Sequence, residues 1–279
     1  MPDEHSSKLE ELGTVARLMD PVLLARGASV VTEPEKLFAA PRHFDGPESC
    51  DFYHTMEIPG VGLVSGAWDL RGCVDQYLGQ MAFAGKRVLE IGPASGFLTI
   101  ELEKRGANVV AIEIPDEAEW DFVPYPASIM DPIYGPRRQH MARVKNSWWF
   151  THAAHCSQAK IVYTDVYRLP DALGTFDTAV MGLVLLHCHS PFQIIEQCAK
   201  RANSLVITEI YRPELDGMPV CRLVPGPENR VWDTWWSFSP EIFTQFLRVM
   251  GFSSLHVSIH EAIPRGTQAR LFTITASRE

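Results

Sequence analysis

The stretch Arg87-Val88-Leu89-Glu90-Ile91-Gly92-Pro93-Ala94-Ser95-Gly96-Phe97-Leu98 decides the fold. Its apolar run at 88–91 predicts a strand buried on both faces, and a helical pattern follows from Gly96 to Lys104. Between them, Gly92 lets the backbone turn, and Gly96 leaves room where a Cβ would obstruct a ligand. Strand, turn and helix N-terminus together predict a site for a nucleotide-like ligand, although a plain strand-to-helix turn would show the same pattern.

Carboxylates follow the next two buried strands. The run 108–113 predicts a second strand ending at Glu113, about 20 residues beyond the turn, where nucleotide-binding folds place the acid that holds a ribose. A NAD-binding domain would show the same acid. The third strand, expected at 160–164, is followed by Asp165 and Val166. This aspartate separates a NAD-binding domain from a second family that the same motifs resemble.

Taken in order, these three elements resemble the cofactor motifs of the class I methyltransferases, which bind S-adenosylmethionine (SAM). Motif I of that family reads E/D-x-G-x-G-x-G, and alanine replaces its middle glycine here. The resemblance implies that the methionine end of SAM contacts the turn, through Glu90, Gly92, Ala94, Ser95 and Gly96. It further implies that Glu113 holds the ribose and that Asp165 with Val166 holds the adenine.

The rest of the chain alternates strands and helices, which predicts an α/β fold. Further strands are expected at 176–183, 204–211, 253–262 and 269–277, and helices at 191–202 and 240–250. The last two strands read as an antiparallel hairpin, as in the class I methyltransferases. We therefore predict a Rossmann-like, seven-stranded methyltransferase sheet with helices on both faces.

Residues 1–84 precede this sheet and are interpreted as an N-terminal cap or lid, followed by a SAM-binding domain at 85–279. In the cap we expect an amphipathic helix at 9–19, a β-hairpin at 52–58 and 61–64, and a helix at 74–83. Two insertions interrupt the domain, at 114–157 and 212–238, and the first holds an expected helix at 137–155. Long ordered insertions are usually functional, so the cap and both insertions are expected to enclose the methyl acceptor.

Composition excludes several classes of function. The 279 residues are 46% hydrophobic and 21% charged, as in soluble globular proteins. The net charge of -9 disfavours a nucleic-acid partner, because phosphate binding needs clustered Lys and Arg. With no long apolar run and no signal peptide, we expect no membrane association and a cytoplasmic location. Cysteines never form Cys-x-x-Cys, and His152 with His155 lacks a third ligand, so no metal site is predicted.

Four strings resemble one branch of the class: Phe-Tyr-His-Thr (52–55), Trp-Asp-Leu-Arg (68–71), Asn-Ser-Trp-Trp-Phe (146–150) and Met-Gly-Leu-Val-Leu-Leu-His (181–187). This branch is similar to the family of the tRNA uridine carboxymethyltransferase, which uses carboxy-SAM, and its small-molecule relatives. The resemblance covers about residues 50–279. The chain departs from the tRNA enzyme because we identify no basic set to grip RNA or to pair with the additional carboxylate of carboxy-SAM.

Methyl transfer is an in-line displacement, and an oxygen or nitrogen acceptor can also need a general base. His187, at the end of the fourth strand, is expected beside the methyl group, with His54 in the cap as the competing base. Either histidine can instead pack or bind substrate. The expected substrate contacts are Tyr53, Trp68, Arg71, Trp148, Trp149, His189, Arg230 and Trp232. The two adjacent tryptophans suit a core position equally well.

We therefore predict a SAM-dependent methyltransferase that acts on an O, N or S atom of a small polar or aromatic metabolite. Its partner is that small molecule, and a homodimer is left open. One alternative is a tRNA-modifying transferase using SAM or carboxy-SAM, which Lys and Arg clustered on one face would favour. The other is a non-catalytic SAM-binding protein, which the lack of a substrate cavity would favour.

Overall fold

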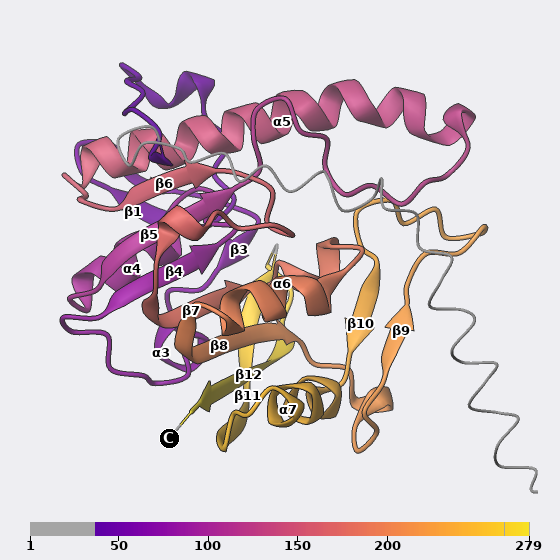
Figure 1. The fold of residues 1–279 in the computed structure, drawn as a ribbon. Coiled ribbons are helices and arrows are strands. Elements are labelled where there is room, and N and C mark those ends of the chain that lie inside the picture. Colours follow the sequence, from indigo (N-terminus) through magenta and orange to yellow (C-terminus); the bar gives the residue numbers. More distant parts are fainter. Residues whose placement is uncertain (1–36, 265, 279) are drawn as a thin grey trace, which may run out of the picture. The chain divides into compact units, whose positions relative to one another are not determined.

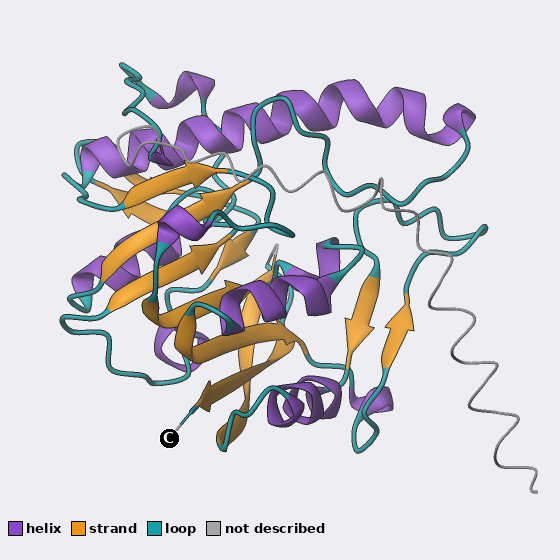
Figure 2. Cartoon of the chain, in the orientation of Figure 1, coloured by secondary structure: helices purple, strands orange, loops and turns teal. Residues whose placement is uncertain are grey.

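A computed structural model describes residues 37–264 and 266–278 of the chain. The chain divides into two units, Met1–Glu33 and Pro34–Glu279, and every described residue belongs to the second. The amphipathic helix expected at 9–19 lies outside the described residues. Figure 1 gives the labels of the helices and strands, and Figure 2 separates them from the loops.

A mixed sheet forms the centre of the second unit, in the order β3-β11-β12-β8-β7-β4-β5-β6. Its parallel strands are β4 (Arg87–Ile91), β5 (Asn108–Glu113), β6 (Lys160–Tyr163), β7 (Phe176–Gly182) and β8 (Ala202–Ile210). Next to β8 lies the antiparallel hairpin of β12 (Ala269–Ser277) and β11 (Ser254–Pro264). The α/β class and the antiparallel closure of the sheet are both as predicted.

The sheet has eight strands, where seven were predicted, because β3 (Trp68–Asp69) joins its edge. Asp69 pairs with Ile263, at the end of β11. Gly66, just before β3, permits the close approach of the cap, since a Cβ there would lie 2.3 Å from the carbonyl carbon of His54. The backbone of Trp68 also hydrogen-bonds the cap, accepting from the N–H of Thr55 at 2.7 Å.

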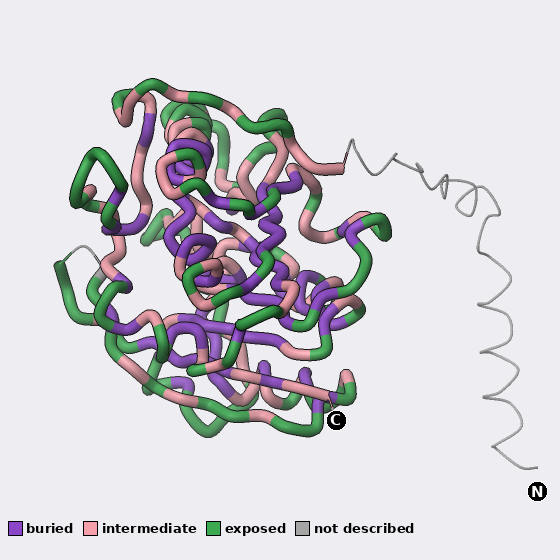
Figure 3. The backbone as a smooth tube through the Cα atoms, turned by 90° about the vertical axis from the view of Figure 1, so that its left-hand side faces the viewer, coloured by how far each residue is buried: buried purple, intermediate pink, exposed green. Residues whose placement is uncertain are grey.

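Helices cover both faces of the sheet. They include α3 (Val74–Tyr77), α4 (Phe97–Lys104), α6 (Pro191–Ala199) and α7 (Pro240–Val249). On β12, the Phe272 ring contacts Phe243 of α7, with centroids 6.1 Å apart. The next residue, Thr273, instead places its hydroxyl 3.5 Å from the carbonyl oxygen of Tyr77 in α3. Because successive strand residues point to opposite faces, α3 and α7 lie on opposite sides. Buried residues concentrate in this layered arrangement (Figure 3).

α3 is shorter than the helix expected at 74–83, because the chain turns at Gly79. This glycine has φ +65, and a Cβ there would lie 2.1 Å from Cγ2 of Thr275 on β12. Leu78 and Phe83 nevertheless point into the core, each 1% exposed. The apolar spacing in the sequence therefore marked burial correctly but did not mark where the helix ends.

The first insertion forms one long helix, α5 (Ala127–Ala154), which begins well before the expected start at 137. The prediction placed the start after the prolines, yet Pro132 and Pro136 lie inside the helix. Each proline removes one backbone hydrogen bond, and tertiary packing overrides that preference here. The buried residues of α5 lie mostly between Val144 and Thr151, in its C-terminal half.

Smaller elements complete the unit. The expected hairpin about Pro59-Gly60 is confirmed as β1 (Met56–Ile58) and β2 (Gly62–Val64). The second insertion contains an antiparallel pair that was not predicted, β9 (Cys221–Leu223) with β10 (Trp236–Phe238). Single 3-10 turns are η2 (Pro47–Ser49), η3 (Asp171–Leu173), η4 (Leu185–His187) and η5 (Pro213–Leu215).

We expect Gly79→Ala to lower the free energy of unfolding by more than Gly85→Ala. Both glycines have left-handed backbone, φ +65 and φ +72, so each alanine costs about 1–2 kcal/mol of backbone strain. Only Gly79 adds a clash, since nothing lies within 4 Å of a Cβ at Gly85. Overpacking of this kind costs about 1–3 kcal/mol more. Urea unfolding of both variants measures the difference, and equal losses would contradict the described contact with β12.

Candidate active site

The turn between β4 and α4 has the left-handed backbone that the glycine pattern predicts. Gly92, Ala94 and Gly96 have φ values of +70, +48 and +90. A Cβ on Gly92 would lie 3.0 Å from Cγ2 of Val184, and one on Gly96 would lie 3.3 Å from Cδ1 of Trp148. Both glycines are therefore required by conformation and by close packing. The space beside Gly96, which we expected to admit a ligand, is filled by the side chain of Trp148.

Ser95, inside this turn, directs its side chain toward the cap. The buried hydroxyl accepts backbone N–H hydrogen bonds from Tyr53 at 3.2 Å and from His54 at 3.1 Å. Ser95 is predicted to contact SAM. Because its hydroxyl already bonds the cap, only its backbone remains for such a contact. These two hydrogen bonds bring Tyr53 and His54 beside the turn. The sequence had placed both residues in a cap without indicating this contact.

Glu90 lies near the end of β4. Its carboxyl group is buried, and one of the two oxygens has no hydrogen-bond partner among the described residues. Its Oε2 accepts a 2.6 Å hydrogen bond from the hydroxyl of Thr99, which in turn accepts from Nε1 of Trp148 at 3.1 Å. Its Oε1 is buried and has no partner among the described residues. Burial raises the pKa of Glu90 to about 7, against the opposing hydrogen bond from Thr99. An unpaired buried acceptor beside the turn fits the ammonium group of SAM.

Glu113 and Asp165 follow at the ends of the neighbouring strands. Oε1 of Glu113 accepts from the backbone N–H of Ile114 at 2.8 Å, and burial raises the pKa of this carboxyl. Asp165 is exposed and accepts from the N–H of Tyr167 at 2.9 Å, while Val166 packs on the core. Because β4, β5 and β6 are adjacent and parallel, these carboxylates lie along one edge, in the order expected for methionine, ribose and adenine.

His187 lies on η4, directly after β7. Its Nδ1 donates to the carbonyl oxygen of Asp233, which leaves the lone pair on Nε2 when the ring is neutral. The ring meets Trp120 edge to face, with centroids 5.3 Å apart. Burial lowers the pKa of His187, so the neutral ring dominates at pH 7.

A buried carboxyl that we did not predict as a site residue positions η4. Oε1 of Glu209, near the end of β8, accepts from the backbone N–H groups of Leu185 at 3.0 Å and Leu186 at 3.2 Å. Burial raises the pKa of Glu209 to about 8. A carboxylate ending an apolar strand was visible in the sequence, but only the fold shows that it faces the loop carrying His187.

His54, the competing base, is also neutral. Its ring lies between Tyr53 and Phe97, with centroid distances of 5.1 and 5.7 Å. Burial lowers its pKa to about 4, and its Nδ1 has no partner in the described part of the chain. Both candidate histidines therefore have the protonation state of a base at neutral pH.

The two adjacent tryptophans are core residues, the second of the two interpretations that the sequence allowed. Trp148 and Trp149 are 1% and 3% exposed. Their indole N–H groups donate to side chains inside the fold, to Thr99 at 3.1 Å and to Tyr163 at 2.9 Å. With both faces packed and both donors used, neither forms a substrate wall.

The other predicted substrate contacts do not gather at one place. Arg71 is exposed and forms a bidentate pair with Asp69, and Arg230 is exposed in a loop with φ +49. Trp68 is half-buried in β3, and its backbone N–H donates to the carbonyl oxygen of Tyr53 at 3.1 Å, so it lies beside the cap residues that Ser95 holds. Trp232 contacts the first insertion through Phe122, with centroids 5.8 Å apart. The sequence predicts that the cap and both insertions enclose one acceptor site. Trp232 joins the two insertions, but Arg71 and Arg230 lie exposed.

Asp121, in the first insertion, connects three loops at the carboxyl edge of the sheet. Its carboxylate accepts from the backbone N–H of His189 at 2.7 Å, and from the Tyr167 hydroxyl. The Nδ1 of His189 lies 2.8 Å from the same carboxylate, and the indole of Trp235 donates to the Asp121 carbonyl at 2.6 Å. His189 is thus bound to the insertion, and no sequence pattern singled out Asp121.

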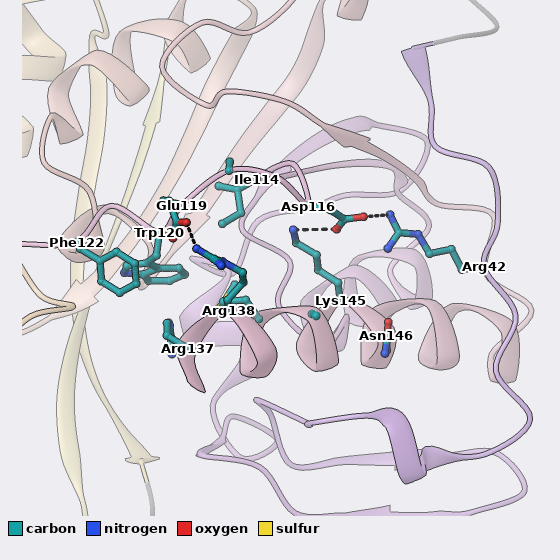
Figure 4. Close-up of a pocket in the computed structure, with 13 residues that line it drawn as sticks. Arg42, Ile114, Asp116, Glu119, Trp120, Phe122, Arg137, Arg138, Lys145 and Asn146 are labelled. Carbon is teal, nitrogen blue, oxygen red and sulfur yellow. Dashed lines mark hydrogen bonds and ion pairs between the residues drawn. The ribbon is translucent and has the colours of Figure 1, made fainter. Parts of the chain in front are cut away.

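A hollow of about 150 Å³ lies inside the first insertion, between its loop at 114–122 and α5 (Figure 4). Asp116 accepts from Arg42 at 2.7 Å and from buried Lys145 at 3.1 Å, and Arg138 pairs with Glu119. Its lining residues are Arg42, Ile114, Asp116, Ala118, Glu119, Trp120, Phe122, Arg137, Arg138, Met141, Ala142, Lys145 and Asn146.

Comparison with protein families agrees with this geometry. Residues 71–257 match the model of a family described as a methyltransferase domain. The chain belongs to this methyltransferase family. The match confirms the prediction of a SAM-dependent methyltransferase made from the turn and the strand-end carboxylates. A search of curated proteins found no significant match.

Solved structures share the fold at low sequence identity. The N-terminal domain of EvdMO1 with S-adenosylhomocysteine (SAH) bound is 15% identical, with a TM-score of 0.53 over 94% of this chain and 98% of that one. The same domain in the presence of SAH and D-fucose is 16% identical, with a TM-score of 0.50 over 93% and 98%. Within the described residues, no helix is long and apolar enough to cross a membrane.

We expect the affinity for SAH to fall about tenfold between pH 8 and pH 6, because binding its ammonium group requires Glu90 as the carboxylate. Glu90 has a pKa of about 7 in the fold and 4.5 as a free group. Between pH 8 and pH 6 the folded, ligand-free protein therefore takes up a proton on Glu90, whereas an ordinary carboxyl with a pKa of 4.5 stays ionised, and binding must expel that proton. Glu90→Gln should weaken binding and flatten the profile.

Calorimetry in two buffers of different ionisation enthalpy measures this proton release directly. Glu209→Gln is the matched control, since Glu209 is also a buried carboxyl with a raised pKa but bonds only backbone N–H groups. A profile that is flat in the unmodified protein would contradict the contact between Glu90 and the ligand.

Proposed function

We propose that the protein transfers the methyl group of SAM to an O, N or S atom of a small polar or aromatic metabolite. The observation that carries the proposal is the row of carboxyl groups Glu90, Glu113 and Asp165 along the parallel edge, beside the left-handed turn. Carboxylates in this row suit a sulfonium cation that also carries an ammonium group. SAM supplies an electrophilic methyl group, and the protein must bind it, orient the acceptor and exclude water.

The acceptor side of the site supports a small, partly aromatic molecule. His187 borders it with Trp120, and Trp232 and Phe122 lie nearby on the two insertions. With Nδ1 bound to a carbonyl oxygen, Nε2 of His187 is free to take a proton from a hydroxyl or an ammonium acceptor. Glu209 would hold η4, and with it His187, in place during this step.

Charge distinguishes this proposal from the tRNA-modifying alternative. Basic residues do gather at the hollow, which was the feature that would favour RNA. However, Arg42 and Lys145 pair with Asp116, and Arg138 pairs with Glu119, so these cations are neutralised locally. Together with the net charge of -9, this supports a small metabolite over a polyanion and leaves the tRNA branch as the second candidate.

We expect Asp165→Ala to weaken SAH binding by about 1–3 kcal/mol, because the acceptor of the adenine amino group is removed. Asp171→Ala is the control, since Asp171 is an exposed aspartate in η3 that pairs with Arg201. Calorimetry with SAH, and separately with NAD, measures both affinities. Absence of SAH binding in the unmodified protein, or preferred binding of NAD, would rule out the methyltransferase assignment.

We expect His187→Ala to lower turnover about 100-fold while SAH binding changes little, if the acceptor must lose a proton. Because burial lowers the pKa of His187 below its ordinary 6.5, activity should fall only on the acid side of that value. His256→Ala, at an exposed position of β11, is the control. Mass spectrometry of a metabolite extract incubated with labelled SAM follows the transfer. An unaltered rate and pH profile would leave His54, or no base, as for a thioether acceptor.

A further inference from the structure

Arg137 differs from the other basic residues around the hollow because it has no ionic partner. Its guanidinium lies over the Trp120 ring, 4.1 Å from the centroid, and 5.6 Å from the centroid of Trp232. It forms no ion pair with any carboxylate of the described residues, and its Nε is buried without an acceptor among them. Burial lowers the pKa of Arg137, with Asp233 the largest of the charges that oppose this. A desolvated, unpaired cation destabilises the free protein unless a ligand compensates it.

A second unpaired donor lies in the same stack. The indole Nε1 of Trp120 is also buried without an acceptor in the described part of the chain. Trp120 in turn contacts His187, the candidate base, with ring centroids 5.3 Å apart. Two buried donors that lack an acceptor in the described structure, the cationic Arg137 and the indole of Trp120, therefore lie together. Both are close to His187, the residue expected beside the methyl group. Buried donors of this kind are paired in nearly all native proteins, so the missing acceptor points to a ligand.

We propose that Arg137 and Trp120 bind a carboxylate carried by an aromatic methyl acceptor. This assignment rests on the proposed function and adds the substrate class to it. A carboxylate offers two acceptor oxygens to the planar guanidinium and the indole N–H, while the ring of the acceptor packs against Trp232. The acceptor atom to be methylated would then lie toward His187.

The cofactor also has a carboxylate, at its methionine end. The turn at 92–96 is expected to bind this end, whereas the rings against Arg137 are Trp120 and Trp232 on the two insertions. Asp233 of the second insertion is the strongest charge opposing the effect of burial on the pKa of Arg137, ahead of Tyr53 and Glu113. This position favours the acceptor as the source of the anion. The experiment separates the two sources by titrating SAH and the aromatic acid independently.

The test uses the full chain saturated with SAH and three probes, benzoate, 4-hydroxybenzoate and the neutral isostere benzamide. We expect the two carboxylates to bind at least about tenfold more tightly than benzamide, as measured by calorimetry. Arg137→Gln should remove this preference without changing the affinity for SAH. Arg138→Gln, the neighbouring arginine paired with Glu119, should preserve it. Arg137→Lys should retain part of it, because the charge remains and the planar donor pair is lost.

Equal binding of benzoate and benzamide to the unmodified protein would overturn the assignment, and so would failure of both carboxylates to bind. This comparison needs no variant, so it decides the matter even if substitutions at Arg137 unfold the protein. Loss of SAH affinity in Arg137→Gln, with aromatic binding intact, would move the contact to the cofactor and also overturn it. A protein that binds no SAH at all would instead refute the methyltransferase function itself.

Discussion

The left-handed turn between β4 and α4 is the constraint on which the other parts of the site depend. Without a Cβ at Gly96, the indole of Trp148 packs against the turn, and this fixes the C-terminal half of α5 beside α4. Inside the same turn, the hydroxyl of Ser95 anchors two backbone N–H groups of the cap. The turn at 92–96 therefore contacts the cap, the cofactor edge and the first insertion. Its backbone conformation fixes the positions of these three parts relative to one another.

A few buried polar groups of the described residues have no hydrogen-bond partner, and three of them belong to residues that the proposals assign to ligands. Most buried polar side chains of the described residues have partners, as native proteins require. Oε1 of Glu90 and the donors of Arg137 and Trp120 are exceptions, and they lie around one edge of the sheet. We propose that the acidic exception binds the cationic cofactor and that the basic one binds the acceptor. On that proposal, their opposite signs would orient the two ligands on either side of the reacting bond.

The sequence predicted the parallel sheet and the shared edge of its strand-end carboxyls, because both depend on local signals. Apolar runs, a glycine turn and strand-end carboxylates lie within a few residues of one another, and parallel pairing brings them together. It failed where tertiary contacts decide. Prolines suggested a later start for α5, but packing carries the helix through Pro132 and Pro136. The contacts of Asp121, Arg137 and Glu209 join residues 17 or more positions apart, and no periodicity reports such contacts.

The length of α5 separates two tasks on one rigid element. Its inner half, around Trp148, is held by the core and by the turn, so substitutions there disturb the whole fold. Its outer half carries Arg137 and Arg138 at positions with few core contacts. Under the proposed function, substitutions at the exposed positions of this half would act on the acceptor side and leave the packing of Trp148 against the turn intact. One helix would then connect a fixed donor site with an acceptor side that tolerates change.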